Sequence, residues 1–409
     1  MRILFLCPVG VIGGAERVLL TAVAALKRTD PNLAIRVIAP VDGPLLPAVS
    51  AAGAEVEIVP MPAILTRLGD SQLRSVGKWR GRFGLLAQAM CALPKASDYV
   101  VRMRAVITRF KPDLVHSNGI KTHLLSRFVV PTAIPVIWHI HDFYGLRPMA
   151  AWALRLARSR VRTGIAISRA VAADASKVLP GVPVKVVMNA IDLSYFCKGP
   201  GVDLDLLAGL PPATPGTVRI GLVATYARWK GHLTFLDAVQ HLAQSSSTLP
   251  VRWYIVGGPI YKTVAQFGEP ELRSAVAARG LQDRVGFIPF QQDPVGVYRG
   301  LDIVVHASTL PEPFGLTVAE AMACGKAVVV SAAGGAAELF TDGKDGLGVS
   351  PGDSCGIASA VNRLVVDSTY REQLGMAARA TAETQFDDSH YGLQLIDVYR
   401  SLIRQYFLI

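Results

Sequence analysis

Two glutamates eight residues apart, Glu312 and Glu320, have the types and spacing that most clearly indicate chemistry in this sequence. They lie in residues 306–325 (HASTLPEPFGLTVAEAMACG), where an apolar run ends, a proline-rich loop follows and a helical pattern begins. The N-terminus of a helix presents free backbone N–H groups and a positive dipole end, which together bind phosphate. The stretch therefore predicts a diphosphate site at the loop–helix junction, with Glu320 placed to accept hydrogen bonds from ribose hydroxyls.

The spacing of Thr317 and Glu320 also has a structural explanation. It matches a capping box, in which Thr317 caps the helix and Glu320 reaches back to the preceding chain. Glu312, between two prolines in a loop, has no comparable structural explanation. A second strand–glycine–helix turn over residues 331–338 (SAAGGAAE) is equally consistent with an ordinary tight connection.

Positive charge for a diphosphate is available in residues 220–232 (IGLVATYARWKGH), which predict a strand, a loop and a helix from about Gly231. Lys230 lies just before that helix, where a cation opposes the helix dipole. A ligand-binding role is therefore favoured over that of a solvated surface lysine. Arg228, in the same loop, is a second candidate cation.

In the first half of the chain, small and polar residues follow three predicted strands: Gly13-Gly14, residues 116–119 (HSNG) and residues 138–142 (WHIHD). Ligands of open α/β sheets bind beyond the carboxyl ends of the strands, so these three segments form a second candidate site. The first of them, with Gly10, does not follow the G-x-G-x-x-G spacing. A dinucleotide oxidoreductase is thus an alternative that rests on this loop alone.

Strand-like apolar runs alternate with helical patterns such as Glu16–Lys27 and Tyr99–Phe110 along the whole chain. This alternation predicts an α/β protein with parallel sheets covered by helices on both faces. The predicted strands are Ile3–Leu6, Ile35–Ala39, Val56–Val59, Leu114–His116, Val136–His139, Thr163–Ile167, Val184–Met188, Val218–Val223, Arg252–Val256, Val285–Phe287, Ile303–His306 and Ala327–Ser331.

The chain of 409 residues divides near a segment rich in proline and glycine. We expect two Rossmann-like domains of similar size that face each other across a cleft. The predicted boundaries are 1–198 for the first domain, 199–216 for a linker, 217–385 for the second domain and 386–409 for a C-terminal helix that packs back on the first domain.

Charge is distributed unevenly between the two halves. The net charge is +11. Residues 1–198 hold 26 Lys and Arg against 11 Asp and Glu, whereas residues 199–409 hold 16 against 20. Five scattered cysteines with no C-x-x-C pair argue against a disulfide framework or a zinc site and favour a reducing cytoplasm. No apolar run is long enough for a transmembrane helix, and the start of the chain does not match a signal peptide.

The basic excess concentrates in residues 61–111, where cations alternate with apolar side chains, and again around residue 158. This pattern suits a peripheral segment on anionic lipid, and it also suits a phosphate-bearing acceptor. A solvated basic face is the structural alternative, and no nucleic-acid recognition motif is present, so we expect no nucleic acid as partner. The cations concerned are Arg67, Arg74, Lys78, Arg80, Arg82, Lys95, Arg102, Arg104, Arg109, Lys111, Arg155, Arg158, Arg160 and Arg162.

The segment from Glu312 to Gly325 resembles the E-x7-E motif of the family 4 glycosyltransferases, which have the GT-B fold. Gly334-Gly335, Glu338 and residues 342–346 (DGKDG) continue the pattern, and the resemblance extends from Gly13-Gly14 to about Asp353. It implies a retaining transfer of a sugar from a nucleotide-sugar without a bound metal. Because the resemblance implies no bound metal, fixed positive charge must stabilise the leaving diphosphate.

The resemblance also implies roles for individual residues. Glu312 corresponds to the acid near the hydroxyls of the donor sugar, Glu320 to the ribose ligand and Lys230 to the family's lysine. The family's arginine falls at Thr225, so Arg228, three residues later, is expected to supply the guanidinium. His141 corresponds to the histidine near the transferred sugar. The remaining positions expected to contact the donor, mainly through the backbone, are Gly13, Gly14, Gly257, Ile288, Phe314, Gly315, Leu316 and Thr317.

The sequence thus predicts a glycosyltransferase whose first domain binds the acceptor and whose second domain binds the nucleotide-sugar. It needs no cofactor beyond that donor, and it builds a glycolipid or polysaccharide precursor at the cytoplasmic face of the membrane, to which it binds peripherally. The acceptor is expected to be anionic or lipid-linked. The alternative is a non-catalytic nucleotide-sugar-binding protein with the same fold.

Overall fold

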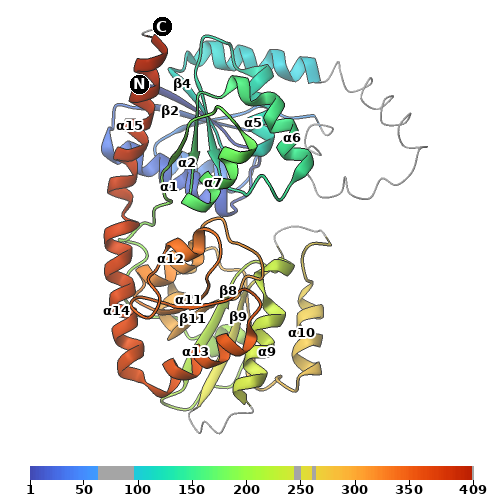
Figure 1. Ribbon diagram of the computed structural model, residues 1–409, viewed down its shortest axis with the longest axis vertical. Coiled ribbons are helices and arrows are strands. Elements are labelled where there is room, and N and C mark those ends of the chain that lie inside the picture. The colour runs from blue at the N-terminus through green and yellow to red at the C-terminus, as the bar shows by residue number, and fades with distance from the viewer. Residues whose placement is uncertain (63–95, 244–249, 260–263, 408–409) are drawn as a thin grey trace, which may run out of the picture. The chain divides into compact units, whose positions relative to one another are not determined.

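The computed structural model describes residues 1–62, 96–243, 250–259 and 264–407. It divides into two compact units (Figure 1): unit 1 comprises Met1–Met188 with Asp388–Ile409, and unit 2 comprises Asn189–Asp387. Each unit is built on a parallel sheet with helices on its faces, as two Rossmann-like domains require. The predicted fold class is confirmed.

The described residues of unit 1 form a seven-stranded sheet with the order β3-β2-β1-β4-β5-β6-β7, and all neighbouring strands are parallel. Its strands are β1 (Arg2–Leu6), β2 (Ala34–Ala39), β3 (Glu55–Ile58), β4 (Leu114–Ser117), β5 (Val136–Ile140), β6 (Thr163–Ala166) and β7 (Val184–Val186). Its helices are α1 (Gly14–Thr29), α2 (Leu45–Ala51), a helix over 96–110, α5 (Ile120–Val129), α6 (Pro148–Ala157), η2 (Arg158–Arg160), α7 (Arg169–Val178) and α15 (Asp388–Phe407).

The described residues of unit 2 form a six-stranded parallel sheet with the order β10-β9-β8-β11-β12-β13. Its strands are β8 (Val218–Val223), β9 (Val251–Gly257), β10 (Val285–Pro289), β11 (Ile303–His306), β12 (Ala327–Ser331) and β13 (Leu347–Val349). Its helices are α8 (Leu204–Ala208), η3 (Arg228–Lys230), α9 (His232–Ala243), α10 (Glu269–Ala278), α11 (Val295–Gly300), α12 (Leu316–Ala323), η4 (Gly335–Glu338), α13 (Ser354–Val366) and α14 (Ser368–Gln385).

The central strands are apolar along their whole length because helices cover both faces of each sheet. Every residue of β5 and of β12 is buried. This explains why continuous apolar runs, and not alternating ones, marked the strands in the sequence. The sequence did not predict β13, which has only three residues with a glycine in the middle.

Each sheet has one point at which the strand order reverses, and there the loops after two neighbouring strands diverge to opposite faces. In unit 1 this switch point lies between β1 and β4, and in unit 2 it lies between β8 and β11. The gap between such loops, at the carboxyl ends of the strands, is where open α/β sheets bind ligands. The loops after β1, β4, β8 and β11 carry most of the chemistry indicated by the sequence.

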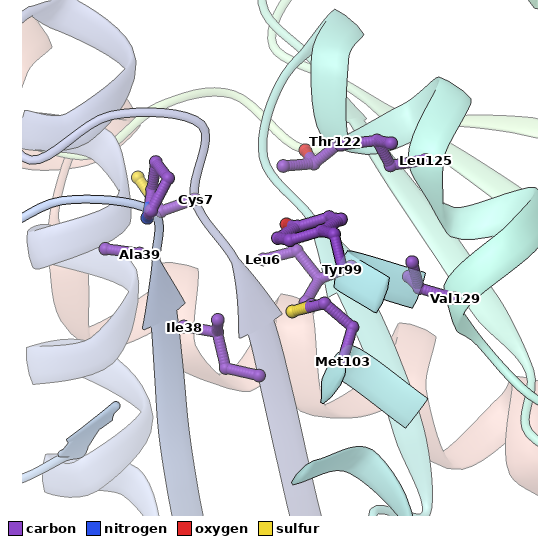
Figure 2. Close-up of a pocket in the computed structure, with 10 residues that line it drawn as sticks. Leu6, Cys7, Ile38, Ala39, Tyr99, Met103, Thr122, Leu125 and Val129 are labelled. Carbon is purple, nitrogen blue, oxygen red and sulfur yellow. The ribbon is translucent and has the colours of Figure 1, made fainter. Parts of the chain in front are cut away.

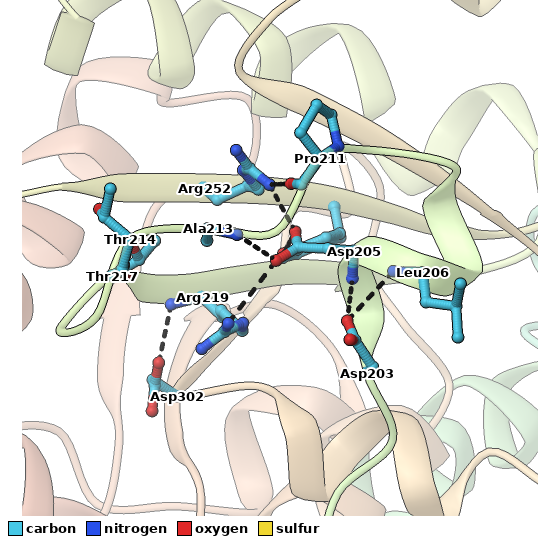
Figure 3. A network of polar contacts seen from close by, with 11 residues as sticks. Asp203, Asp205, Leu206, Pro211, Ala213, Thr214, Thr217, Arg219, Arg252 and Asp302 are labelled. Atoms are coloured by element: carbon cyan, nitrogen blue, oxygen red, sulfur yellow. Dashed lines mark hydrogen bonds and ion pairs between the residues drawn. The ribbon is translucent and has the colours of Figure 1, made fainter.

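Residues 199–216, predicted as a linker, include the short helix α8 and belong to unit 2 (Figure 3). Asp205 of this helix is 2% exposed, and its carboxylate accepts hydrogen bonds from the Tyr254 hydroxyl at 2.6 Å and from the Arg252 guanidinium at 2.7 Å. Burial alone would raise the pKa of Asp205, but these hydrogen bonds outweigh burial and lower it below its ordinary value. The network fastens the segment to strand β9.

The C-terminal helix α15 packs along α1 in unit 1 (Figure 1). The helices approach closely at Gly392, where an added Cβ would lie 2.6 Å from the backbone oxygen of Ala25. Asp388 pairs with Arg28 at one end of the crossing. Farther along, the Tyr399 hydroxyl lies 2.7 Å from Nδ1 of His116 in β4, so the helix reaches the sheet itself. No helix within the described ranges is both long and apolar enough to cross a membrane.

Candidate active site

Lys230 and Glu312 meet at the switch point of unit 2. Lys230 ends the short η3 turn after β8, and Glu312 lies in the loop after β11, 82 residues later. The Lys230 ammonium donates a hydrogen bond of 2.6 Å to Oε2 of Glu312, and both side chains are at most 16% exposed. The Lys230 ammonium also lies 4.2 Å from the centre of the Trp229 ring. Two residues to which the family resemblance gives donor-site roles are therefore direct partners.

A histidine and a serine complete the surroundings of Glu312. Nε2 of His306 lies 3.2 Å from Oε2 of Glu312, and the Ser308 hydroxyl donates to the same oxygen at 3.1 Å. The hydroxyl also lies 3.0 Å from Nε2 of His306. Three polar groups, including that of Lys230, thus converge on one carboxylate oxygen. All three of these contacts are made to Oε2 and none of them to Oε1.

The electrostatics of this cluster keep Glu312 ionised. Burial alone would raise the pKa of its carboxyl group, but the charge of Lys230 and the hydrogen bond from His306 lower it to about 2. A negatively charged carboxylate and a lysine are therefore held side by side in a largely buried position. An anion bound here would compete with Glu312 for the Lys230 ammonium. His306 and Ser308 would still contact Oε2 of Glu312.

The loop that carries Glu312 leads directly into helix α12. Gly315 caps this helix with φ of 104°, a backbone conformation that favours glycine, and no side chain caps its first N–H groups. Phe314 is buried, and Leu316 and Thr317 open the helix partly exposed. The capping-box explanation for Thr317 and Glu320 is wrong, because the helix begins one residue before Thr317. The N–H groups of its first turn can receive an anion.

Glu320 lies in the second turn of α12 and is 6% exposed. Its Oε2 accepts a hydrogen bond of 2.7 Å from the hydroxyl of Tyr298 in α11. The tyrosine fixes the orientation of a carboxylate that the sequence assigns to a ribose. The predicted donor residues Glu312, Gly315 and Glu320 therefore follow one another along a single loop–helix connection.

Arg228 is held away from Lys230 by contacts of its own. Its guanidinium pairs with both carboxylate oxygens of Glu271 at 2.9 and 3.0 Å, and its Nε donates to the backbone oxygen of Val264. The guanidinium carbon lies 4.3 Å from the centre of the Phe267 ring. Both bonds to Glu271 come from the same guanidinium nitrogen of Arg228.

Thr225 and Gly257 are neighbours at the carboxyl ends of β8 and β9. Gly257 has φ of 147°, and an added Cβ would lie 1.9 Å from the backbone oxygen of Ala224, so only glycine fits. Ile288, in the edge strand β10, pairs with Val256, and its side chain is fully buried. No part of Ile288 is therefore exposed to a ligand in this structure.

In unit 1, Asn118 joins the glycine loop to His141. Gly13 caps α1, its N–H donates to the buried Glu16 carboxylate at 3.1 Å, and Gly14 is the first residue of the helix. The Asn118 amide donates to the backbone oxygen of Ala15 at 3.2 Å, and its Oδ1 lies 2.8 Å from Nε2 of His141. The loops after β1, β4 and β5 are therefore connected through one side chain.

These contacts fix the proton on His141. The oxygen of Ala15 can only accept, so the NH₂ group of Asn118 faces it and Oδ1 faces the histidine. Nε2 of His141 must then carry the proton, and Nδ1 keeps its lone pair. Burial lowers the pKa of His141 to about 3, so the ring is a neutral hydrogen-bonding group at physiological pH.

Three further histidines, His116, His123 and His139, are buried near His141 in unit 1. Burial lowers the pKa of His116 to about 3 and lowers those of His123 and His139 well below the ordinary value. The ring of His139 lies 4.2 Å from that of His141 and 5.0 Å from that of His116. Both ring nitrogens of His139 lack a hydrogen-bond partner among the described residues.

A small cavity lies beside the ends of β1 and β2 (Figure 2). Leu6, Cys7, Ile38 and the Tyr99 and Met103 side chains of helix 96–110 contribute to its lining. Its volume of about 10 Å³ is room for about one water molecule and not for a sugar. Burial raises the pKa of Cys7 to about 12, so its thiol stays protonated and unreactive.

The sequence did not assign roles to His306, Ser308, Asn118 or Tyr298. His306 and Ser308 lie at the end of a predicted strand in the stretch that contains Glu312, and Asn118 lies in residues 116–119, at the end of another predicted strand. Their position at strand ends was the available signal. Tyr298 carried no local signal. Within the described ranges, no group of three or more His, Cys, Asp or Glu side chains is arranged to hold a metal.

Comparison with known proteins identifies the class. A sequence model described as "Glycosyltransferase Family 4" matches residues 12–195, and one described as "Glycosyl transferases group 1" matches residues 214–381. The two parallel-sheet units have the GT-B fold, and the family models and relatives identify the chain as a glycosyltransferase. The two matches together span most of the chain, and the chain belongs to the family 4 glycosyltransferases, as the E-x7-E resemblance predicted.

Individual relatives cover much of this chain. The alpha-maltose-1-phosphate synthase of Mycobacterium tuberculosis is 28% identical over 385 residues, which cover 86% of this chain and 95% of that protein. The D-inositol 3-phosphate glycosyltransferase of Mycolicibacterium smegmatis is 34% identical over 214 residues, 51% of this chain and 47% of that protein. The crystal structure of Anabaena Alr3699/HepE with UDP and glucose is 25% identical, with a TM-score of 0.76 over 98% of this chain and all of that one.

Proposed function

We propose that the protein transfers a sugar from a nucleotide-sugar to an anionic acceptor, with retention of anomeric configuration and without a metal. The acceptor we propose is a glycolipid or polysaccharide precursor at a membrane surface. The observation that carries the proposal is the pair of Lys230 and Glu312, 2.6 Å apart at the switch point of unit 2 and next to the open N-terminus of α12.

In unit 2, each group has a role that its geometry supports. The N–H groups from Gly315 onward and the Lys230 ammonium would bind the diphosphate, and their fixed positive charge stabilises the leaving group without a metal. Oε1 of Glu312 would accept hydrogen bonds from the hydroxyls of the transferred sugar. Glu320, oriented by Tyr298, would accept hydrogen bonds from the ribose. Main-chain groups around Gly257 and Ile288 would contact the base.

Retention requires the acceptor to attack from the face that the diphosphate leaves. The bond between the anomeric carbon and the diphosphate oxygen breaks, and a bond to the acceptor oxygen forms on the same face. The acceptor proton passes to the departing phosphate oxygen, so no separate protein base is needed. His141, neutral and with a free lone pair at Nδ1, would orient a sugar hydroxyl, and the glycine loop at Gly13-Gly14 would let substrate approach the backbone.

The comparisons suggest which substrates to test first. Anabaena Alr3699/HepE binds UDP and glucose, so UDP-glucose is the first donor to test. The name of the D-inositol 3-phosphate glycosyltransferase specifies a phosphorylated acceptor. A thermal-shift screen of UDP-, GDP- and ADP-sugars would identify the base. A comparison of lipid-linked with water-soluble phosphorylated acceptors would then separate the two sources of negative charge.

The proposal is tested by Glu312→Ala, with transfer measured by release of the nucleoside diphosphate. We expect at least about a thousandfold loss of turnover with an unchanged far-ultraviolet circular dichroism spectrum. Glu383→Ala, on the exposed side of α14, is the matched control and should keep full activity. Addition of EDTA should change nothing. Full activity of Glu312→Ala would refute the site assignment.

A second candidate function is a nucleotide-sugar-binding protein without turnover. One observation favours it: threonine occupies the position of the family's arginine, and the nearby Arg228 is paired with Glu271. Slow hydrolysis of the bound donor by the purified protein, lost in Glu312→Ala, would rule it out. Tight donor binding with neither hydrolysis nor transfer would support it.

A further inference from the structure

Helix α6 in unit 1 exposes a row of large apolar side chains. Met149, Trp152 and Leu156 are 75%, 66% and 59% exposed, and their spacing of three and four residues places them on one face of the helix. The opposite face holds the buried residues Leu154 and Ala157. An exposed tryptophan flanked by two exposed apolar residues is uncommon on a surface that faces only water.

Apolar exposure continues on the elements beside α6. Leu146, just before the helix, is 58% exposed, and Phe128, at the end of the adjoining helix α5, is 55% exposed. Val101 of helix 96–110 is 65% exposed, and Arg104 of that helix donates a hydrogen bond to the backbone oxygen of Phe128. We name Leu146, Met149, Trp152, Leu156 and Phe128 the α6 patch.

The surroundings of the α6 patch are basic and contain few acids. Between residues 96 and 162 the chain carries 11 Lys and Arg against 3 Asp and Glu. Arg127, Arg155 and Arg162 are exposed there, whereas Arg160 is buried and bound to backbone oxygens, so it adds little to the surface charge. The basic residues of the sequence-predicted segment from Arg67 to Lys95 lie outside the described residues and do not enter this count.

We propose that the α6 patch docks on an anionic lipid surface, with Trp152 and Leu156 entering the interface and the arginines contacting the head groups. Apolar side chains on one helical face with cations beside them are what an interfacial helix requires. Tryptophan is the side chain enriched at membrane interfaces. Charge complementarity favours an anionic occupant over a neutral one, and a fluid anionic membrane, unlike an acidic protein surface, does not have to match the shape of the patch.

The position of α6 ties the docking surface to the proposed acceptor site. The helix begins at Pro148, seven residues after His141, and Arg147 just before it pairs with Asp142 at 3.2 Å. A membrane bound at α6 would therefore lie next to the loop proposed to contact the transferred sugar. This inference rests on the proposed function only for the identity of the acceptor, since lipid binding itself requires no turnover.

Vesicle flotation of the full chain at low salt tests the docking surface, with phosphatidylglycerol–phosphatidylcholine vesicles compared with pure phosphatidylcholine. We expect the protein to float with the anionic vesicles only. Trp152→Ser and Leu156→Ser should each lower the bound fraction about tenfold. Leu206→Ser, which removes a side chain 76% exposed in unit 2, is the matched control and should bind as the unaltered protein does.

Absence of flotation with anionic vesicles, or equal flotation of Leu156→Ser and the unaltered protein, would overturn the proposal. So would a concentration-dependent dimer in vesicle-free buffer that Leu156→Ser abolishes, because a second copy would then cover the patch. Donor hydrolysis in vesicle-free buffer separates this result from the proposed function. Leu156→Ser should hydrolyse donor at the unaltered rate, whatever happens to vesicle binding.

Discussion

The two switch points of this molecule have the same topology but differ in the charge of the side chains that meet there. In unit 2 the loops after β8 and β11 bring together an ammonium and a carboxylate, with the pKa of Glu312 lowered to about 2. In unit 1 the loops after β1, β4 and β5 bring together glycines, an asparagine and a neutral histidine, His141, whose pKa is lowered to about 3. The unit 2 site is centred on an ion pair, whereas the groups that Asn118 joins in unit 1, the Ala15 carbonyl and the His141 ring, are uncharged at physiological pH.

This difference in charge indicates which part of the proposed substrates each sheet edge would suit. A diphosphate carries charge that develops further as it leaves, so fixed positive charge is useful in unit 2. Sugar hydroxyls are neutral, and neutral donors and acceptors discriminate between them by direction. Under the proposed function, the same sheet edge would suit two parts of the reaction, because the loops and not the strands supply the polar groups.

Low pH should distinguish the two units most strongly, because the stability of unit 1 depends on buried histidines that stay neutral. His116, His123 and His139 stay uncharged in the folded state, while in the unfolded chain they bind protons below about pH 6.5. Stability is therefore lost as pH falls below about 6.5, by up to about 4 kcal/mol per pH unit for the three together. Unit 2 holds one such histidine, His232, and the contribution of Glu312 fades only below about pH 4.5.

Hydrogen-exchange mass spectrometry at pH 7.5, 6.0 and 5.0 measures this difference region by region. Peptides from β4 and β5 should lose protection before those from β8 and β11. His139→Phe removes a ring whose nitrogens lack partners, so it should shift the loss in unit 1 to lower pH, whereas the exposed His241→Gln should not. Equal loss in both units at every pH would contradict the assignment.

Lys230→Ala should have the next largest effect. Without its ammonium, Glu312 keeps only His306 and Ser308, and the diphosphate loses its nearest side-chain cation. We expect turnover to fall about a thousandfold, or about 4 kcal/mol in transition-state stabilisation, with donor affinity also reduced. Steady-state transfer kinetics and donor titration by calorimetry would measure the two effects.

Arg228→Ala tests whether Lys230 is the main side-chain cation of the unit 2 site. Its guanidinium is paired with Glu271, so Arg228→Ala should cost less than Lys230→Ala if that pairing persists with donor bound. A loss equal to that of Lys230→Ala would show that Arg228 leaves Glu271 to reach the phosphate. It would then fill the role left open by Thr225.

Tyr298→Phe should have the smallest effect. It removes one hydrogen bond to the buried Glu320 carboxylate, at a cost of about 1 kcal/mol. We expect donor KM to rise roughly fivefold with kcat nearly unchanged. Tyr391→Phe is the matched control for stability, since its buried hydroxyl has no partner among the described residues. A change in kcat without a change in KM would contradict a ribose-positioning role.

Much of the fold was predictable because burial on both faces makes parallel strands apolar throughout. The candidate pair of Lys230 and Glu312 was predictable by type, and topology explains why residues 82 positions apart meet. Tyr298 was not predictable, because the partner of a buried hydroxyl depends on how α11 and α12 pack. The capping box failed because the positive φ of Gly315 starts the helix earlier than the Thr317 pattern indicates.

The return of α15 to unit 1 has a consequence for how the protein is made. The chain forms most of unit 1, then all of unit 2, and then α15. Tyr399, the partner of the buried His116, is synthesised 283 positions after it. During synthesis, all of unit 2 is therefore made before unit 1 receives α15. A premature stop codon after Gln385 would leave unit 1 without helix α15.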